Sequence, residues 1–135
     1  MPSRLGILTI VLTLGAACSS LPTGTANGRV HEIKVTDSVS SGDLTIQVGD
    51  EVRWLNHKPV AVTIAFLGLP TDNVVCRRGF QTWTGRTSRS TRLKPQDSAS
   101  LCFAHAGVLH YHVVMDGSVP SAQIISPGAI RVVGP

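Results

Sequence analysis

Short runs in which apolar and polar residues alternate recur along this chain, and residues that favour turns follow most of them. Leu44, Ile46 and Val48 alternate with polar residues, and Gly49 and Asp50 come directly after them. A period of two places the apolar side chains on one face of a β-strand, as in a strand with one buried face. The sequence shows no heptads, no long amphipathic helix and no internal repeat. This pattern predicts an all-β domain, a sandwich of short strands.

The alternation locates the expected strands, and one long segment falls outside it. The expected strands are residues 30–35, 44–48, 52–54, 60–67, 98–103, 108–114 and 129–133. The run at 60–67 is almost continuously apolar, which suits a central strand. Residues 68–91 lack clear periodicity, with room for one short strand or helix. Such an excursion is unusual in a compact domain, so we expect it to carry function or to be held by a crosslink.

Length and composition set the size of this domain. The chain has 135 residues, enough for one domain once a targeting segment is removed. Apolar residues make up 42% of it, which is too many for a disordered chain. Aromatic residues make up only 4% and charged residues 15%, whereas glycine (13) and proline (8) are frequent. This balance favours many turns over long helices.

The N-terminus has the three parts of a secretory signal. Arg4 supplies a positive charge, residues 5–14 form a short apolar run, and small residues lead to Cys18. The run is too short for a permanent membrane-spanning helix. Small residues that end at a cysteine resemble the bacterial lipobox, and this resemblance implies cleavage before Cys18 and lipid chains on it. The alternative is an ordinary signal peptide cut near Ala17.

The lipobox resemblance predicts how the chain is organised and where it resides. Residues 1–17 are expected to be the lipoprotein signal peptide, residues 18–28 a lipidated, flexible tether, and residues 29–135 the folded domain. Ser19 stands where an Asp would retain such a protein at the inner membrane, which implies sorting to the outer membrane. We therefore expect a cell-envelope protein whose lipid on Cys18 holds it to the periplasmic side of the outer membrane.

The three cysteines of the chain fit an oxidising compartment. If Cys18 carries lipid, Cys76 and Cys102 remain as a pair able to form a disulfide. That bond would close a loop of about 27 residues and stabilise the fold by on the order of 3 kcal/mol. The alternative is that one or both of these cysteines are free thiols able to hold a metal.

Several segments of the domain resemble those of cupredoxins of the plastocyanin and azurin type. Residues 48–56 (VGDEVRWLN) resemble the stretch in which a Gly-Asp turn leads into a strand ending Trp-x-Asn. Residues 93–103 resemble the later strand that ends in an aromatic residue. Residues 107–112 (GVLHYH) resemble the run before the copper cysteine, and residues 128–132 the closing strand. Together they imply a cupredoxin-like Greek-key β-sandwich over nearly all of the domain.

The resemblance also locates the positions at which this family holds copper, and the residues there differ. A type 1 copper site combines a thiolate, two imidazoles and a weak axial ligand. The cysteine position falls at Val113, and the first histidine position falls at Ala61 or Val62. Residues 114–117 contain no histidine for the second position, although Met115 remains as a weak ligand. The resemblance therefore implies a cupredoxin-like domain without its type 1 centre, and no cofactor is expected.

A metal site with displaced ligands is the alternative. His110 and His112 lie two apart, so in a strand they share a face, with about 7 Å between their Cα atoms. Two imidazoles at this spacing suit Cu(II), Ni(II) or Zn(II). The core face of this strand is expected to belong to Leu109, Tyr111 and Val113. The two histidines would then lie on the outer face.

Further candidate ligands lie close by in the sequence. His105 follows Cys102 with Cys-x-x-His spacing, and Met115 follows the two histidines. A disulfide at Cys102 would remove its thiolate from any metal site. Met115 is also the kind of residue that packs in a core.

Basic residues gather in the aperiodic segment and just after it. The formal net charge is +4. The basic patch consists of Arg77, Arg78, Arg86, Arg89, Arg92 and Lys94. Such a patch suits anionic lipid headgroups, an acidic protein or a redox partner, and export argues against nucleic acid. The alternative is a solvated loop, in which Trp83 is either a contact residue or an anchor.

No enzyme signature is present in the sequence. It contains no Gly-x-Ser-x-Gly elbow, phosphate loop, His-Glu-x-x-His motif or haem attachment motif. The sequence therefore predicts a non-enzymatic binding or accessory module in the envelope. One alternative is a copper-binding or electron-transfer protein that uses His110 and His112. The other is a thiol/disulfide protein that uses Cys76 and Cys102.

Overall fold

The computed structural model describes residues 28–134 except 41, 118 and 120. The expected signal peptide, the lipidation site Cys18 and the tether up to residue 27 lie outside these residues. Within the described part, no helix is long and apolar enough to cross a membrane.

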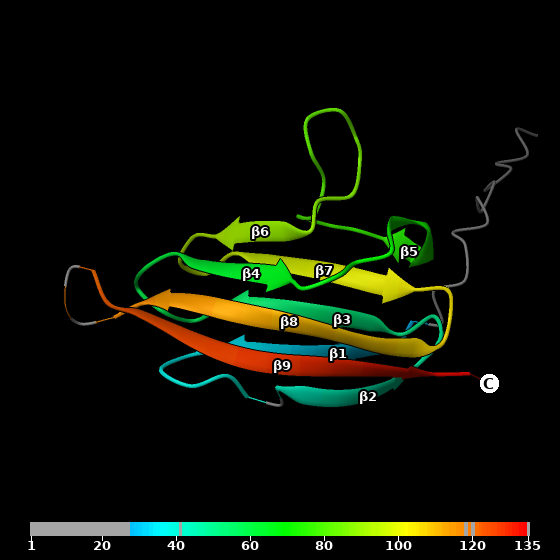
Figure 1. Ribbon diagram of the computed structural model, residues 1–135, viewed down its shortest axis with the longest axis horizontal. Helices are drawn as coiled ribbons and strands as arrows, with labels where there is room; N and C mark the ends of the chain where they lie inside the picture. The colour runs from blue at the N-terminus through cyan, green and yellow to red at the C-terminus, as the bar shows by residue number, and fades with distance from the viewer. Residues whose placement is uncertain (1–27, 41, 118, 120, 135) are drawn as a thin grey trace, which may run out of the picture.

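The described residues form an all-β sandwich of two sheets, as predicted (Figure 1). The first sheet has the order β1 (Val30–Val35), β3 (Glu51–Asn56), β7 (Ser98–Phe103), β5 (Val74–Cys76). The second has the order β2 (Asp43–Gln47), β9 (Gln123–Val133), β8 (Gly107–Asp116), β4 (Val62–Phe66), β6 (Ser90–Leu93). A single 3-10 turn, η1 (Thr71–Asn73), precedes β5.

The chain crosses from one sheet to the other at nearly every connection between consecutive strands. β1 pairs in parallel with β3, and β2 in parallel with β9, whereas the other strand pairs are antiparallel. Among the strands of the described residues, β8 and β9 are the one consecutive pair that is hydrogen-bonded together, from Gly107 opposite Val132 to Asp116 opposite Gln123. Figure 1 shows this hairpin reaching beyond the other strands at one end of the sandwich.

The core lies between the two sheets and is centred on aromatic rings. Trp54 of β3 lies 5.7 Å from Phe66 of β4 and 5.5 Å from Tyr111 of β8, measured between ring centroids. Phe80, from the connection between β5 and β6, lies 5.7 Å from Trp54. Alternation explains which side chains meet here, since Leu109, Tyr111 and Val113 are buried as predicted. Both sheets and the long excursion therefore share one core.

Gly128 allows β9 to cross the ring of Tyr111. The Tyr111 hydroxyl donates a hydrogen bond to the Gly42 carbonyl, at 3.1 Å. A Cβ atom at position 128 would collide with the Tyr111 ring and lie 2.6 Å from the Gly42 carbonyl oxygen. Glycine is the residue that fits at this crossing, because every other side chain needs the space that the ring occupies.

The excursion at 68–91 contains little regular structure, and the near-apolar run before it is an inner strand. β4 lies between β8 and β6, which agrees with the prediction of a central strand for residues 60–67. The excursion holds η1, β5 and the start of β6, and between them a loop stands off the sandwich (Figure 1). We call residues 77–89 the projecting loop.

Candidate functional site

Three positions that the family resemblance assigns to copper ligands, Val62, Val113 and Met115, lie together in the second sheet, and Ala61, the alternative first histidine position, directly precedes β4. Val62 of β4 pairs with Met115 of β8, and Val113 pairs with Ile64. Val62 and Met115 are each 1% exposed, and Val113 is fully buried. The three residues belong to the hydrophobic core between the sheets. Apart from the Met115 thioether, these side chains carry only carbon and hydrogen.

Asn56 fixes the chain that leads into this region. Its side chain is fully buried, and its amide nitrogen lies 2.8 Å from the Val60 carbonyl and 3.1 Å from those of Leu93 and Lys94. Its side-chain oxygen accepts a hydrogen bond from the Lys58 amide at 2.9 Å. These hydrogen bonds hold the connection between β3 and β4, so the backbone that leads to Val62 has a fixed conformation.

The candidate histidine ligands do not converge. His110 and His112 share the outer face of β8, as expected, opposite Ala129 and Pro127 of β9. Met115 lies on the other face of the same strand and is buried. His105 is exposed in the connection before β8. Over the described ranges, no three His, Cys, Asp or Glu residues are grouped so that they could hold a metal.

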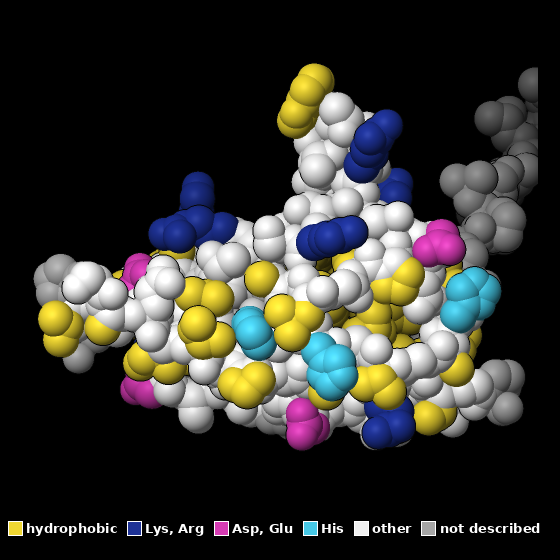
Figure 2. Space-filling model, in the orientation of Figure 1, with side chains coloured by type: hydrophobic (Ala, Val, Ile, Leu, Met, Phe, Trp, Pro, Cys, Tyr) yellow, Lys and Arg dark blue, Asp and Glu magenta, His cyan; other side chains and the backbone are white. Residues whose placement is uncertain are grey.

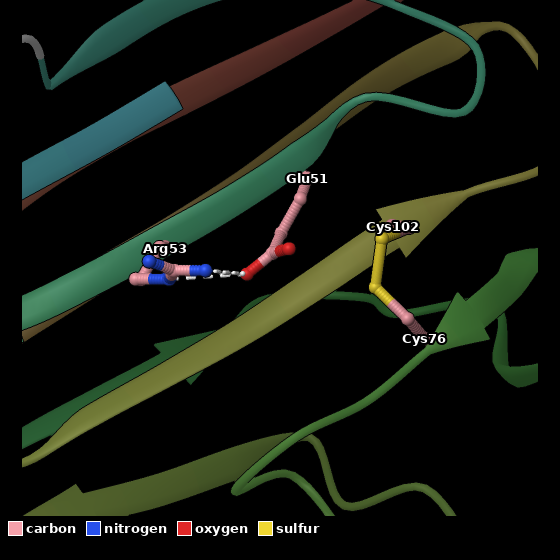
Figure 3. Close-up of a disulfide and its surroundings, with 4 residues drawn as sticks. All are labelled: Glu51, Arg53, Cys76 and Cys102. Carbon is pink, nitrogen blue, oxygen red and sulfur yellow. Dashed lines mark hydrogen bonds and ion pairs between the residues drawn. A yellow bond between two sulfur atoms is a disulfide. The ribbon is translucent and has the colours of Figure 1, made fainter. Parts of the chain in front are cut away.

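Cys76 and Cys102 form the predicted disulfide (Figure 3). The bond joins β5 to β7 and spans a sequence separation of 26. Cys102 is 1% exposed and lies opposite Glu51 of β3, whose carboxylate accepts a 2.8 Å bond from Arg53. The oxidised Cys102 has no thiolate to offer a metal with His105, which removes the Cys-x-x-His pair as a ligand set.

The projecting loop is a braced structure with an aromatic tip. The Ser88 amide donates to the Phe80 carbonyl at 2.7 Å, and the Thr82 amide donates to the Arg86 carbonyl at 2.8 Å. A tight turn closes the tip, where the Gly85 amide donates to the Thr82 carbonyl at 2.9 Å and Gly85 has a φ of 80°. Trp83 lies in this turn and is 98% exposed.

Four residues of the basic patch belong to this loop, and Arg92 and Lys94 continue the patch along β6 and just beyond it. Figure 2 shows Lys and Arg side chains gathered on the loop and along β6, at the edge of the second sheet. Arg77 and Arg86 line one recess of about 570 Å³ together with Asp72 and Thr87. Arg77 also donates to the Thr87 hydroxyl at 3.3 Å. The ion pairs of the described residues involve none of the six cations of the patch.

One polar contact was missed by the sequence analysis. The imidazole Nε2 of His31 lies 2.8 Å from a carboxylate oxygen of Asp50, which is 1% exposed. The same oxygen accepts a 3.0 Å hydrogen bond from the Gln47 amide. The Gly-Asp turn was visible in the sequence, but its partner on β1 becomes a neighbour only through the pairing of β1 with β3.

The strand order, the mixed pairing and the terminal β8–β9 hairpin define a cupredoxin-like β-sandwich. The solved structures that resemble it include amicyanins. An oxidised amicyanin variant superposes with a TM-score of 0.51 at 21% identity, over 80% of this chain and 85% of that one. Two variants solved as Cu(I) forms give TM-scores of 0.50 at 22% and 21% identity, with the same coverage. Similarity at this level of identity shows the fold alone.

Sequence comparison gives no closer link. No protein-family model matches the chain, and no curated protein sequence matches it significantly. The cupredoxin-like fold is therefore established by structure.

Proposed function

We propose that this protein is an envelope-anchored lipoprotein whose cupredoxin-like domain lacks a type 1 copper centre and serves as a non-enzymatic binding or accessory module. The observation that carries the proposal is the chemistry of Val62 and Val113. Val113 stands at the cysteine position of the family resemblance, and Val62 or its neighbour Ala61 stands at the first histidine position. Both valines are buried in the apolar core, and alanine has no lone pair to donate either.

The residues at these positions do not fit a type 1 copper ion. Such an ion needs a thiolate and two imidazoles within bonding distance, and valine has no lone pair to donate. The last histidine of the chain is His112, which precedes the cysteine position instead of following it. Met115 would be left as the single ligand, and a lone thioether does not hold a copper ion against water. Electron transfer through a copper centre at this place is therefore unsupported.

The other parts of the proposal have separate support. Envelope anchoring rests on the charge, apolar run and small residues that precede Cys18. A binding role rests on the projecting loop, which presents Trp83 to solvent and carries Arg77 and Arg86, which take part in none of the ion pairs among the described residues. A structural role for the disulfide rests on its place in the fold, where it ties the half-buried Cys76 of β5 to Cys102, which is buried within β7.

Copper retention tests the proposal. The full chain is incubated with Cu(II), desalted, and analysed for copper per protein and for visible absorption. We expect no retained copper and no band in the red region of the spectrum. As a matched gain-of-function control, Val62→His combined with Val113→Cys places an imidazole and a thiol at the two ligand positions. This variant should retain more copper than the parent.

Each contrary outcome has its own meaning. Stoichiometric copper with an intense red-region band would overturn the proposal and restore an electron carrier. Bound copper without that band would favour the His110 and His112 pair, and His110→Ala with His112→Ala should then abolish it. A free-thiol count above zero for Cys76 and Cys102 in the folded protein would reopen the thiol/disulfide alternative.

A further inference from the structure

The exposure of Trp83 is built into the loop that carries it. The backbone on either side of the tip pairs through the Thr82–Arg86 hydrogen bond and through a bridge between Gln81 and Thr87. The hydroxyls of Thr82 and Thr84 lie 2.8 Å apart across the turn. The loop is therefore closed by its own hydrogen bonds and does not need Trp83 to pack on anything. The largest side chain of the loop is left free for a contact outside the molecule.

The opposite arrangement holds three residues earlier. Phe80 is fully buried and touches the rings of Trp54 and Phe66, with centroids 5.7 and 5.9 Å away. The disulfide at Cys76 fixes the chain just before it. Phe80 thus anchors the loop in the core, whereas Trp83 lies at its exposed tip. Figure 2 shows a hydrophobic side chain at the summit of the projecting loop, with basic side chains just below it.

Charge at the base of the loop is strongly one-sided. Arg77 and Arg86 line the recess beneath the tip, and Asp72 is the acidic residue that lines it with them. Arg89, Arg92 and Lys94 continue the positive surface along β6, and all three are exposed. In the described part of the chain, none of these cations is neutralised by an ion pair.

We propose that the projecting loop docks on the surface of an anionic phospholipid bilayer, with the Trp83 indole at the headgroup level and Arg77 and Arg86 against lipid phosphates. Tryptophan favours the membrane interface because its ring is apolar while its N–H stays hydrated. Basic residues beside such a ring are drawn to the negative surface potential of anionic lipids. This arrangement needs no complementary pocket on the other side.

A bilayer fits this surface better than a protein partner does. Tryptophan hot spots at protein interfaces lie in packed patches whose neighbours exclude water. The neighbours of Trp83 in the turn are Thr82, Thr84 and Gly85, which are small and exposed. A narrow tip with one aromatic ring can enter a fluid interface, whereas it would bury little surface on a rigid partner.

The proposed anchor would hold the domain close to a membrane. From Cys18 to Gly28 the chain can span at most about 35 Å, at about 3.5 Å per residue. The inference rests on the proposed envelope anchoring for its membrane, and the lipid that it names is any anionic phospholipid of that bilayer. Anchor and loop would then be two contacts with one surface, each of which raises the effective concentration of the other.

Depth-dependent fluorescence quenching tests the loop separately from the anchor. The full chain is reconstituted with vesicles of phosphatidylethanolamine and phosphatidylglycerol, with or without brominated acyl chains. Flotation measures attachment of the chain, and quenching of tryptophan emission measures insertion of the ring. The chain has two tryptophans, of which Trp54 is fully buried. Subtracting the spectrum of Trp83→Phe therefore isolates the emission of Trp83.

We expect the emission of Trp83 to shift to the blue and to fall at least twofold on brominated anionic vesicles. This loss of emission should be smaller in 0.5 M salt and on phosphatidylcholine vesicles. It should also be smaller in the Arg77→Ala with Arg86→Ala variant, in which each lost arginine is expected to lower the affinity of the loop for the vesicles roughly fivefold. Arg131→Ala is the matched control, because Arg131 is exposed on β9 and should leave quenching unchanged.

The two assays separate the possible failures. A chain that floats with vesicles while Trp83 keeps its water-exposed emission would overturn the loop proposal and leave the anchor intact, and Trp83 would then belong to a protein interface. Equal quenching on neutral and anionic vesicles would overturn the role of the arginines. A chain that neither floats nor shows quenching would overturn the anchor and the loop contact together.

Discussion

Tyr111 shows how burial in this core changes the pKa of a single side chain. Its ring packs edge-on against Trp54, and its hydroxyl is bonded to the Gly42 carbonyl at 3.1 Å. Burial raises the pKa of the Tyr111 phenol to about 12, because the phenolate would lose its hydration among apolar side chains. The native state therefore favours the neutral phenol more strongly than the unfolded chain does.

An alkaline titration checks this prediction at the residue scale. The unfolded phenol ionises near pH 10, so between about pH 10 and 12 the unfolded state has lost a proton that the native state keeps. The contribution to stability is complete below about pH 10 and is lost as the pH rises towards 12. Tyr111 is the only tyrosine, so ultraviolet difference absorbance reports it alone. A native transition near pH 10 would contradict the prediction.

The variant Tyr111→Phe supplies the control for that titration. It should lower the free energy of unfolding at neutral pH by about 1 kcal/mol, because the hydrogen bond to Gly42 is lost. Above pH 10 it should lose less stability than the parent, since no phenol remains to ionise. Urea denaturation at a series of pH values measures both effects.

At the scale of elements, the alternation of side chains was sufficient for most strands. β1 and β7 occupy the residues predicted for them, and β8 extends its prediction at both ends. β9 begins at Gln123 although Pro127 and Gly128 interrupt its pattern. The Ala129 amide donates to the Gly42 carbonyl, on the side of β9 away from β8, and the nitrogen of Pro127, two residues earlier, lies on that same side. Proline is tolerated there because β2 pairs with β9 only from Ala129 onward. Such a tertiary reason is not visible in the local sequence.

The sequence could not assign roles within the aperiodic loop. It predicted the disulfide from cysteine count and the outer face of His110 from strand alternation, and both are found. Phe80 and Trp83 are both aromatic residues in a segment without period, so nothing local tells which is buried. Phe80 is the buried one because its ring packs against those of Trp54 and Phe66, which come from distant parts of the sequence.

The two aromatic residues provide a matched pair for mutation. Phe80→Ala should lower the free energy of unfolding by about 3–5 kcal/mol, because it opens a cavity beside Trp54. Trp83→Ala should change it by less than about 0.5 kcal/mol, because this side chain is 98% exposed. Urea denaturation of the two variants measures the contrast. Similar losses in both would mean that the projecting loop packs in another way.

At the scale of the whole molecule, the two sheets and the excursion form one structural unit. Trp54, Phe66 and Tyr111 come from three strands of the two sheets, and Phe80 joins them from the excursion. The disulfide ties β5 at one edge of the first sheet to β7. A unit with a single shared core is expected to unfold in one cooperative step.

Removal of the disulfide tests this expectation. Cys76→Ala combined with Cys102→Ala should lower the free energy of unfolding by on the order of 3 kcal/mol, because the unfolded chain regains its freedom. Circular dichroism and the fluorescence of buried Trp54 should still follow one transition. Two separate transitions would show that the excursion unfolds by itself. An unchanged free energy of unfolding would show that the disulfide does not stabilise the fold.

The place of β9 between β2 and β8 has a consequence for biosynthesis. β2 is made early in synthesis, yet its partner in the second sheet is the last strand of the domain, with Asp43 opposite Ala129. A growing chain therefore cannot close this sheet while residues 123–133 are still missing, and pairing over so long a separation is slow. Completion of the β-sandwich is therefore expected to wait until residues 123–133 have been made, so that release of the whole domain precedes its final folding step.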